Sequence, residues 1–266
     1  MKRKNVLITL EGVGMIITSK DNNRIKEIKK LKQKKYRTDK YIVEGAKMIQ
    51  EAIAENLDID VIVFRSGYNF EIDVSKYDII ETTETVFNEL TDVVSPQGIL
   101  AVINKNKNTH NIDTSDNYII ALNGIQDPGN LGTIIRTADA ANIKQIIVSK
   151  DTVDSYSPKV IRSTMGAIFR VNIIEVDNLY ETLKNMKKCG FEIVTTQLDG
   201  KKSFYDVVYN KKIVVIGNEA NGVSDAVQEI SDHKVKIPMP GKAESLNASV
   251  ATGLMIYEYV RQFLNH

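Results

Sequence analysis

The sequence has a single cysteine, Cys189, and only three histidines, and both shortages exclude whole classes of site. One cysteine cannot form a disulfide within the chain, and no Cys/His cluster is present that would resemble a structural zinc site. A serine hydrolase triad has little support, because His110 falls in a polar segment, His266 ends the chain and only His233 remains. We therefore expect a cytoplasmic protein that needs no metal.

Long apolar runs are also missing, since none approaches the ~18 residues that span a membrane. The basic, briefly apolar beginning resembles a signal peptide, but Glu11 interrupts it and no small-residue cleavage site follows. We interpret residues 1–14 as a leader or extension, with Met15 as the truer start. The Rossmann glycine fingerprint, the P-loop and the HExxH motif are absent, so nicotinamide, nucleotide triphosphate and zinc-protease sites lose their usual support.

Positive charge is concentrated in one segment, although the formal net charge is only +1. Between Lys20 and Lys40 ten basic residues face three acidic ones, whereas the other 25 basic residues face 31 acidic ones. Ile25, Ile28 and Leu31 recur there every three residues, which predicts an amphipathic helix over residues 22–35 with a basic outer face. Such a run is often only a solvated surface helix, but a helix held by ion pairs would mix signs. A run of one sign suits a partner rich in phosphate.

Alternating helix and strand patterns divide the chain into two parts. Residues 15–104 predict a small α/β unit with strands at 41–43, 59–64, 78–81 and 98–104 and helices at 45–54 and 84–90. Residues 105–117 are polar and rich in Asn, Thr and Asp, which is typical of an interdomain linker. Residues 118–266 alternate strands at 118–123, 145–149, 171–176, 191–195 and 212–217 with helices, which predicts a parallel sheet covered on both faces. Ligands of such sheets bind at the carboxyl ends of the strands.

The stretch from Lys236 to Val260 carries the most unusual local pattern. A loop with Pro238, Pro240 and Gly241 leads into Ser245 and Asn247, and a helical stripe of Leu246, Val250, Leu254 and Tyr257 follows. The plain interpretation is a helix capped by Ser245 or Asn247. The prolines stiffen the loop, and Ala248, Ala251 and Gly253 keep the helix surface small, although glycine costs about 1 kcal/mol in a helix. These small residues predict that other backbone passes close by.

Three long segments together resemble a known family. The segments NGIQDPGNLGTIIRTADAANI, IVVIGNEANGVS and IPMPGKAESLNASVATGLMIYE look like the three signature motifs of the SpoU, or TrmH-type, RNA 2'-O-ribose methyltransferases. They stand in the family's order and span the part from Tyr118 to His266. The N-terminal part resembles, more loosely, the ribosomal-protein-like RNA-binding domain of one subgroup, through its pattern and VEGAKMIQEAI at Val43 to Ile53.

The resemblance implies a fold, a cofactor and partners. The fold is α/β: a trefoil-knotted SPOUT domain with a parallel sheet, preceded by a small α/β RNA-binding domain. A knot is an exception to the rule against threaded chains and no periodicity reveals it. S-adenosylmethionine is the implied methyl donor, no metal is implied, and the catalytic domain is expected to form a homodimer. The small residues of the last helix would then pack in the knot or across the dimer interface.

Matched position by position, the resemblance also implies a set of site residues. The catalytic set is Arg136, Asn130, Glu219, Ser245 and Asn247. The cofactor-binding set is Thr195, Thr196, Gly217, Ile237, Met239 and Leu246. For RNA binding the basic segment supplies Arg24, Lys29, Lys30, Lys34, Lys35 and Arg37.

The expected chemistry is methylation of a ribose 2'-hydroxyl, a weak acid and poor nucleophile. Transfer requires alignment of the hydroxyl with the methyl group and stabilisation or removal of its proton. Arginine has a pKa above about 12 and is a poor general base, so we expect Arg136 to position and polarise. Ribosomal RNA, of the large subunit in particular, is the expected substrate. Two alternatives stay open: a tRNA 2'-O-methyltransferase, and a non-catalytic RNA-binding ribosome assembly factor with the same fold.

Overall fold

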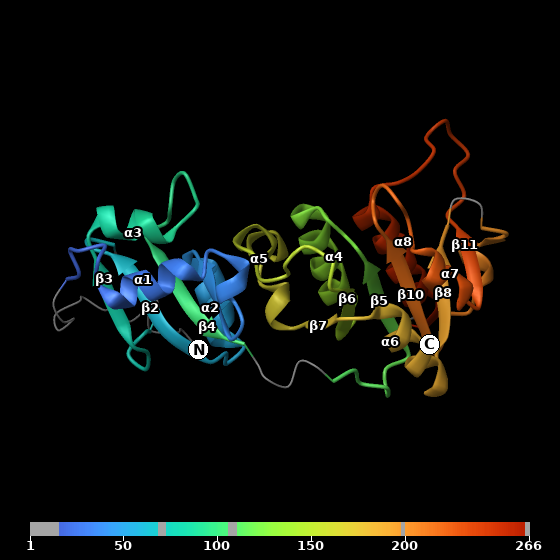
Figure 1. Ribbon diagram of the computed structural model, residues 1–266, viewed down its shortest axis with the longest axis horizontal. Coiled ribbons are helices and arrows are strands. Elements are labelled where there is room, and N and C mark those ends of the chain that lie inside the picture. The colour runs from blue at the N-terminus through green and yellow to red at the C-terminus, as the bar shows by residue number, and fades with distance from the viewer. Residues whose placement is uncertain (1–15, 69–72, 106–110, 198–199, 264–266) are drawn as a thin grey trace, which may run out of the picture. The chain divides into compact units, whose positions relative to one another are not determined.

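The chain forms two compact units in the computed structural model, which describes residues 16–68, 73–105, 111–197 and 200–263 (Figure 1). The N-terminal unit comprises the chain up to Asn106 together with Tyr156–Phe169, and the C-terminal unit comprises Lys107–Ser155 and Arg170–His266. The leader expected at residues 1–14 lies outside the described residues. The sequence predicted one boundary between the two units, at the linker. It did not predict that residues 156–169 group with the first unit.

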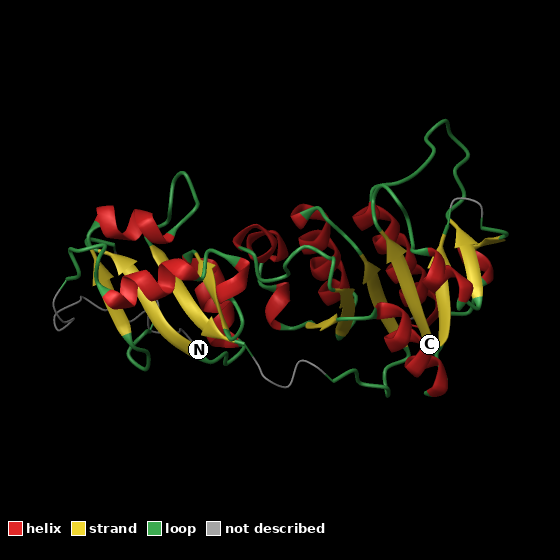
Figure 2. Cartoon of the chain, viewed as in Figure 1, coloured by secondary structure: helices red, strands yellow, loops and turns green. Residues whose placement is uncertain are grey.

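The N-terminal unit is a four-stranded mixed sheet with helices on both faces (Figure 2). Its elements are α1 (Asn23–Lys30), β1 (Lys40–Glu44), α2 (Ala46–Ala54), β2 (Ile59–Arg65), β3 (Ile79–Thr82), α3 (Glu84–Leu90), β4 (Ile99–Asn104) and α5 (Pro158–Thr164), with short 3-10 turns at Lys34–Tyr36 and Ala167–Phe169. The strand order is β1-β4-β2-β3, and β4 runs antiparallel to both neighbours.

Two apolar layers hold this unit together. Val61 and Val63 face one side of the sheet with Ile25 of α1 and Phe87 of α3, whereas Ile62 faces the other side with α2 and α5. Successive strand residues point to opposite faces, so the apolar run of β2 supplies both layers. The predicted helix over residues 22–35 is shorter than expected: α1 ends at Lys30 and a separate 3-10 turn follows at Lys34. The predicted inward residues Ile25, Ile28 and Leu31 are buried.

The C-terminal unit is built on a seven-stranded sheet in which every neighbouring pair of strands is parallel. Its elements are β5 (Tyr118–Asn123), α4 (Pro128–Ala140), β6 (Gln145–Ser149), β7 (Asn172–Val176), α6 (Leu179–Lys188), β8 (Glu192–Thr196), β9 (Lys202–Ser203), β10 (Lys212–Gly217), α7 (Asp225–Glu229), β11 (His233–Lys236) and α8 (Ala248–Phe263). The order is β7-β6-β5-β10-β8-β11-β9. The expected parallel α/β sheet is confirmed.

Helices cover both faces of this sheet, as the continuous apolar strands require. Leu183 of α6 and Val227 of α7 pack with Ile119, Ala121 and their neighbours on one face. The opposite face is covered by α4 and α8, which also pack against each other (Figure 1). Residues 111–117 of the predicted linker belong to this unit, because the side chain of Gln145 bonds to both the N–H and the carbonyl of Asp113, at 3.0 and 2.7 Å.

The apolar stripe of α8 points outward. Val250, Leu254 and Tyr257 are 51%, 38% and 50% exposed, and the face of α8 turned inward carries Thr252 and Met255 instead. The stripe predicted from spacing therefore exists but does not join the core. A Cβ added at Gly253 would lie 3.8 Å from the Cγ2 of Thr137, which is ordinary contact, so α4 alone does not require glycine there.

Candidate active site

The three motif segments meet at the carboxyl edge of the large sheet, where two neighbouring strands send their helices to opposite faces. β5 leads into α4 on one face, and the adjacent β10 leads into α7 on the other. Open α/β sheets bind their ligands at such a change of direction. The loops that meet there are residues 124–127 after β5 and residues 218–224 after β10, and the start of α8 joins them.

A chain of side-chain hydrogen bonds links one residue from each segment. The amide Nδ2 of Asn247 donates to Oδ1 of Asn130 at 2.9 Å, and Nδ2 of Asn130 donates to Oε1 of Glu219 at 2.9 Å. Asn130 is placed by the start of α4, where the Asp127 carboxylate accepts its backbone N–H at 2.8 Å and Pro128 occupies the first turn. The structure thus brings together three of the five predicted catalytic residues.

Asn247 fixes the start of α8 as well as the polar chain. Its Oδ1 accepts the backbone N–H of Ser249 at 2.9 Å and the Ser249 hydroxyl at 2.6 Å. Of the two caps that the sequence allows, Asn247 is therefore the one that forms. Because its Oδ1 is committed to the helix, its Nδ2 is directed to Asn130. The same side chain of Asn247 thus caps α8 and orients Asn130 in the site.

Glu219 gathers the loop that follows β5. Its carboxylate accepts the backbone N–H of Gln126 at 3.2 Å and of Asp127 at 3.4 Å, in addition to the Asn130 amide. Burial acts to raise the pKa of Glu219, but the hydrogen bonds from Asn130 and from backbone N–H groups prevail and lower it. Glu219 is therefore an acceptor at neutral pH, suited to orienting donors and poorly suited to taking up a proton.

Arg136 and Ser245 are exposed, and within the described part of the chain neither has a hydrogen-bond or ion-pair partner. Arg136 lies on α4, six residues after Asn130. Ser245 stands two residues before the capping Asn247. Arg136 is thus an exposed cation held on the same helix as Asn130 and left available to a substrate.

The predicted cofactor residues lie at the ends of neighbouring strands. Thr195 and Thr196 end β8, and Gly217 ends β10. Ile237 and Met239, both half-buried, follow β11. Leu246, 36% exposed, closes the loop before α8.

The loop from 237 to 246 has the unpaired backbone that a bound cofactor needs. Among the described residues none of its backbone N–H or carbonyl groups takes part in a hydrogen bond within the chain. Free backbone groups beside half-buried apolar side chains suit a ligand that has both a flat base and a charged amino-acid end. The donor set present therefore fits S-adenosylmethionine.

Gly217 lies at the base of a tight turn, in which the loop after β10 folds back onto the end of the strand. A Cβ added there would lie 2.1 Å from the carbonyl carbon of Gly222 and 2.2 Å from the nitrogen of Val223. Asn218 and Gly222 exchange backbone hydrogen bonds of 2.9 Å in both directions. Only glycine fits at position 217, because the neighbouring atoms are backbone and cannot move aside like a side chain.

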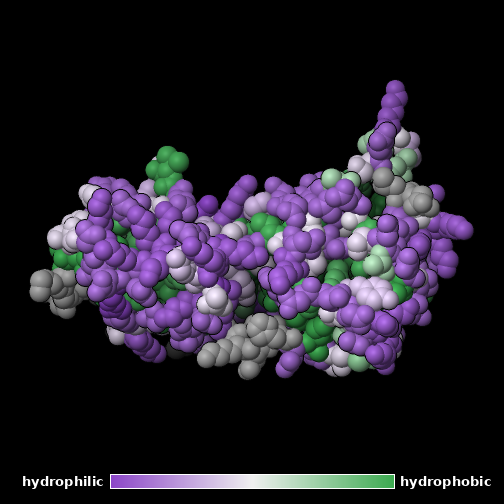
Figure 3. Space-filling model, viewed as in Figure 1, coloured by the Kyte–Doolittle hydropathy of each residue, from purple (hydrophilic) through white to green (hydrophobic). Residues whose placement is uncertain are grey.

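The predicted RNA-binding residues differ in whether their charged groups already have partners within the chain. Arg24 and Lys29 bond to Asp78 and Glu89. Lys30 pairs with Glu27 at 3.2 Å, and Lys35 lies over the ring of Tyr36, 4.8 Å from its centre. Lys34 is exposed and has no partner among the described residues. The outer face of this segment is strongly hydrophilic (Figure 3), but ion pairs neutralise part of its charge.

Arg37 does not fit the prediction. It is only 6% exposed, and its Nη1 donates to the carbonyl oxygen of Leu31 at 2.7 Å. The guanidinium satisfies a carbonyl left over at the end of α1, which is a structural role. An alternating basic sequence cannot distinguish such a buried arginine from its exposed neighbours.

Several residues that hold the site were not predicted. Nδ2 of Asn218 donates to the carbonyl of Gly124 at 2.7 Å, and the hydroxyl of Ser149 accepts the N–H of Gly124 at 2.9 Å. Gly124 has a positive φ of 76°, which suits glycine. Its loop is therefore fastened from both sides. Asn218 could have been predicted as a site residue from its position directly after Gly217. Nothing in the sequence predicts that Ser149 bonds to Gly124.

The described residues include neither a membrane-spanning helix nor a metal-binding cluster. No helix in the described ranges is long and apolar enough to cross a membrane. Within the same ranges no group of three or more His, Cys, Asp or Glu side chains could hold a metal ion.

Known proteins resemble both parts of the chain. The SpoU rRNA methylase family matches residues 117–257, and the MRM3-like substrate-binding domain matches residues 22–101. The 23S rRNA (guanosine(2553)-2'-O)-methyltransferase RlmP of Bacillus subtilis is 29% identical over 245 residues, covering 91% of this chain and 97% of that protein. A Mycoplasma pneumoniae protein named as an uncharacterized tRNA/rRNA methyltransferase is 30% identical over 236 residues, covering 80% of this chain and 94% of that protein. The AdoMet-bound rRNA methyltransferase of Sinorhizobium meliloti superposes with a TM-score of 0.82 at 28% identity, covering 94% of this chain and 98% of that one.

Proposed function

This chain belongs to the SpoU rRNA methylase family, and from that premise we propose how its residues carry out the reaction. It is an S-adenosylmethionine-dependent RNA 2'-O-methyltransferase. The observation that supports a working site is the chain of hydrogen bonds from Asn247 through Asn130 to Glu219, which joins all three motif segments. The cofactor, when bound, supplies an activated methyl group, so no metal is needed for transfer.

We propose that each polar residue positions the ribose. Arg136 holds the phosphate next to the target ribose or polarises its 2'-hydroxyl, because it is a free cation on a rigid helix. Asn130 is held by Glu219 on one side and Asn247 on the other, so its orientation is set before the substrate arrives. Ser245 supplies a further hydrogen bond to Arg136 or to the nucleotide. In this arrangement the site acts through alignment and charge.

Calorimetry with S-adenosylmethionine separates this enzyme from a non-catalytic RNA-binding protein. We expect a single binding event per chain, and transfer of labelled methyl groups to RNA. If the protein bound RNA in a salt-sensitive way but did not bind S-adenosylmethionine, the assembly-factor alternative would be correct. Intact Asn130, Arg136 and Asn247 count against that outcome.

We propose large-subunit ribosomal RNA as the substrate. The relative with 29% identity over nearly the whole chain is named as a 23S rRNA methyltransferase, and its match includes the N-terminal unit. A separate substrate-binding unit at residues 15–104, joined by the linker to a catalytic unit at 118–266, suits a large folded RNA. A tRNA substrate remains the second candidate, because other relatives are named as tRNA/rRNA methyltransferases. With such a substrate the protein works in the cytoplasm.

Lys34 and Lys35 are expected to contribute more to RNA binding than Lys29 and Lys30. The first pair has no anionic partner in the described chain, whereas the second pair already has Glu89 and Glu27. Reversing Lys34 and Lys35 to glutamate should weaken RNA binding and flatten the log–log salt dependence by about 1.5, for two lost phosphate contacts. Filter binding at several salt concentrations measures both effects.

The Lys29→Glu, Lys30→Glu double variant is the matched control on the same surface. We expect a smaller loss of affinity from it than from the Lys34, Lys35 reversal. If the wild type and the Lys34, Lys35 variant bound RNA with equal affinity, this segment would be an ordinary solvated surface with no role in RNA binding.

We propose that the exposed stripe of α8 forms a homodimer. Val250, Gly253, Leu254 and Tyr257 lie at helical spacing on one face, and the three apolar side chains are 38% to 51% exposed. An exposed apolar patch on a helix face is typical of an interface. Gly253 on this face would permit a close approach by the partner, which explains a glycine that the contact with α4 does not require.

Introducing aspartate at Leu254 and Tyr257 should therefore produce a monomer. The wild type is expected at twice the chain mass of 29.8 kDa in light scattering, and the double variant at that mass. Val94→Asp is the matched control, because Val94 is fully exposed and belongs to the N-terminal unit. A wild-type protein that is already monomeric would contradict the dimer.

We propose, finally, that the trefoil knot of the resembling family is formed here by residues 195–248. Two features support it: β8 lies between β10 and β11, and α8 returns to pack beside β10.

A further inference from the structure

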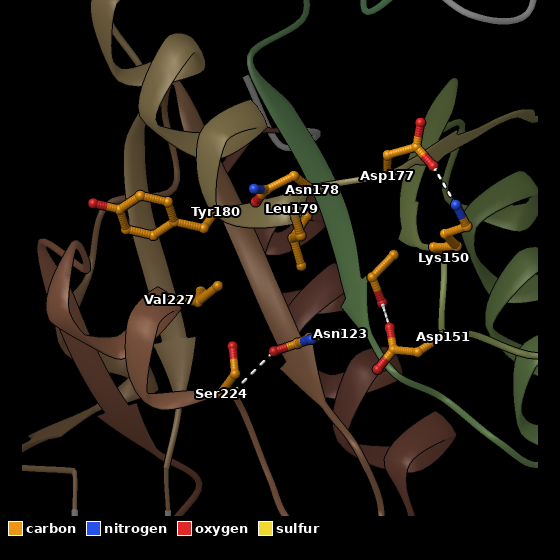
Figure 4. A pocket seen from close by; sticks show the side chains of 10 residues that line it. Asn123, Lys150, Asp151, Asp177, Asn178, Leu179, Tyr180, Ser224 and Val227 are labelled. Atoms are coloured by element: carbon orange, nitrogen blue, oxygen red, sulfur yellow. Dashed lines mark hydrogen bonds and ion pairs between the residues drawn. The ribbon is translucent and has the colours of Figure 1, made fainter.

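A hollow lies at the same edge of the large sheet, next to the predicted cofactor residue Gly217, whose strand neighbour Asn123 lines it (Figure 4). We name it the β5–β7 pocket, because it lies at the carboxyl ends of β5, β6 and β7. Its volume is about 410 Å³, within the range of small-molecule sites. Its lining includes Asn123, Asp151, Asn178, Leu179, Ser224 and Val227. None of the predicted cofactor or catalytic residues lines it.

Two asparagines in this pocket keep their amide donors free. Oδ1 of Asn123 accepts the N–H of Ser224 at 2.9 Å, and Oδ1 of Asn178 accepts the N–H of Glu181 at 3.1 Å. These bonds fix both side chains and turn each Nδ2 away from the backbone. Among the described residues neither Nδ2 has an acceptor. Oδ1 of Asp151 accepts a hydrogen bond from the Ser149 hydroxyl. Its other oxygen, Oδ2, has no donor among the described residues. The pocket therefore offers fixed donors and a fixed acceptor.

The charges of the lining disfavour a phosphate. Lys150 is the cation of the lining, and its Nζ is already paired with Asp177 at 2.8 Å on the exposed rim. The Asp151 carboxylate adds a second negative charge. Leu179 and Val227, which are 5% and 2% exposed, add an apolar floor. An uncharged flat ligand with both donors and acceptors fits this lining, and a nucleobase has that chemistry.

The loop after β5 connects the pocket to the active site. Gly124 donates its N–H to Ser149 on the pocket side, and Nε2 of Gln126 donates to the carbonyl of Asp151. The backbone N–H groups of Gln126 and Asp127 bond to Glu219 on the other side. A nucleotide beside the target ribose would pass over this short loop. Proteins that recognise single-stranded RNA bind such unstacked bases in pockets.

We propose that the β5–β7 pocket receives the base of an RNA nucleotide adjacent to the one that is methylated. The inference rests on the proposed function, since it takes RNA as the substrate of the neighbouring site. Reading a neighbouring base would let the catalytic unit contribute to the choice of nucleotide, in addition to the N-terminal unit. Free Asn amides and a free carboxylate oxygen favour a base that presents both N–H donors and a carbonyl acceptor.

Nuclear magnetic resonance of the full chain tests the pocket without any methyl transfer. The probes are guanosine, adenosine, cytidine and uridine, each titrated separately, and inorganic phosphate. We expect at least one nucleoside to shift the side-chain amide signals of Asn123 and Asn178, and phosphate to leave them unchanged. Shifts with phosphate alone, or no shift with any nucleoside, would overturn the proposal.

Asn178→Asp is the sharpest variant, because aspartate keeps the oxygen that caps α6 and loses only the amide donor. Its KM for RNA is expected to rise about tenfold, with the affinity for S-adenosylmethionine and the thermal stability unchanged. Asn185→Asp makes the same change on the exposed side of α6 and should leave KM as in the wild type. An unchanged KM in Asn178→Asp would refute the pocket, whereas a wild type without methyl transfer would refute the proposed function instead.

Discussion

Arg136→Ala is expected to reduce methyl transfer about 100- to 1,000-fold while the protein still folds and binds S-adenosylmethionine. Removing one fixed donor aimed at developing charge typically has an effect of that size. Arg136 is exposed on α4 and has no partner among the described residues, so its loss breaks no contact that holds the fold. The free energy of unfolding should change by no more than about 0.5 kcal/mol. A tritiated-methyl assay and a thermal melt measure the two quantities.

Two further variants sharpen this result. Arg136→Lys keeps the charge but loses the planar pair of donors, so partial activity is expected if Arg136 holds a phosphate. Lys144→Ala removes an exposed cation just after α4 and should leave activity unchanged. Full methyl-transfer activity in Arg136→Ala would contradict the positioning role that we assign to Arg136, even if the protein folds normally.

Gly217→Ala is expected to destabilise the C-terminal unit by about 3 kcal/mol or more and to abolish binding of S-adenosylmethionine. The added methyl carbon would lie 2.1 Å from the backbone of Gly222 and 2.2 Å from that of Val223, far inside contact distance. Overpacking against backbone atoms that cannot rotate away forces the turn at residues 218–222 open. This turn also holds Asn218 and Glu219, so the active site would be disrupted with it.

Gly241→Ala provides the matched control. Gly241 lies in the loop before α8, and a Cβ built there meets nothing within 4 Å. Both variants add one methyl group to a glycine beside the expected cofactor loops, and only one of them creates a clash. Denaturant unfolding and calorimetry should show a near-normal Gly241→Ala protein. Equal stability of the two variants would mean that the turn at Gly217 is not as tight as the structure indicates.

Much of the fold could be predicted because its strands carry strong patterns. Buried strands such as Tyr118–Asn123 are apolar without interruption, and the helices between them begin with clear caps, as Asp127 and Pro128 do for α4. The short elements were missed, because β9 has two residues and α7 five, too few for a period to show. The position of Tyr156–Phe169 was also missed, because contacts between distant segments leave no local pattern.

The candidate site was predicted through family motifs, and the structure adds the contacts that connect them. That Asn130 bonds to both Glu219 and Asn247 follows from three loops meeting in space, which spacing along the chain cannot reveal. Periodicity identified the stripe of α8 but not its direction, because an exposed apolar stripe has the same spacing as one in a core. The burial of Arg37 could not be predicted either, because a buried arginine within a basic segment has the same spacing as its exposed neighbours.

Mapping of ribose methylation tests the central claim most directly. Large-subunit RNA from cells lacking this gene is incubated with the purified protein and S-adenosylmethionine, in parallel with small-subunit RNA and tRNA, and 2'-O-methyl positions are read before and after. The account predicts a new 2'-O-methyl group in the large-subunit RNA, absent with Arg136→Ala. A methyl group on a base, or no methylation of any RNA by a protein that binds S-adenosylmethionine, would contradict it.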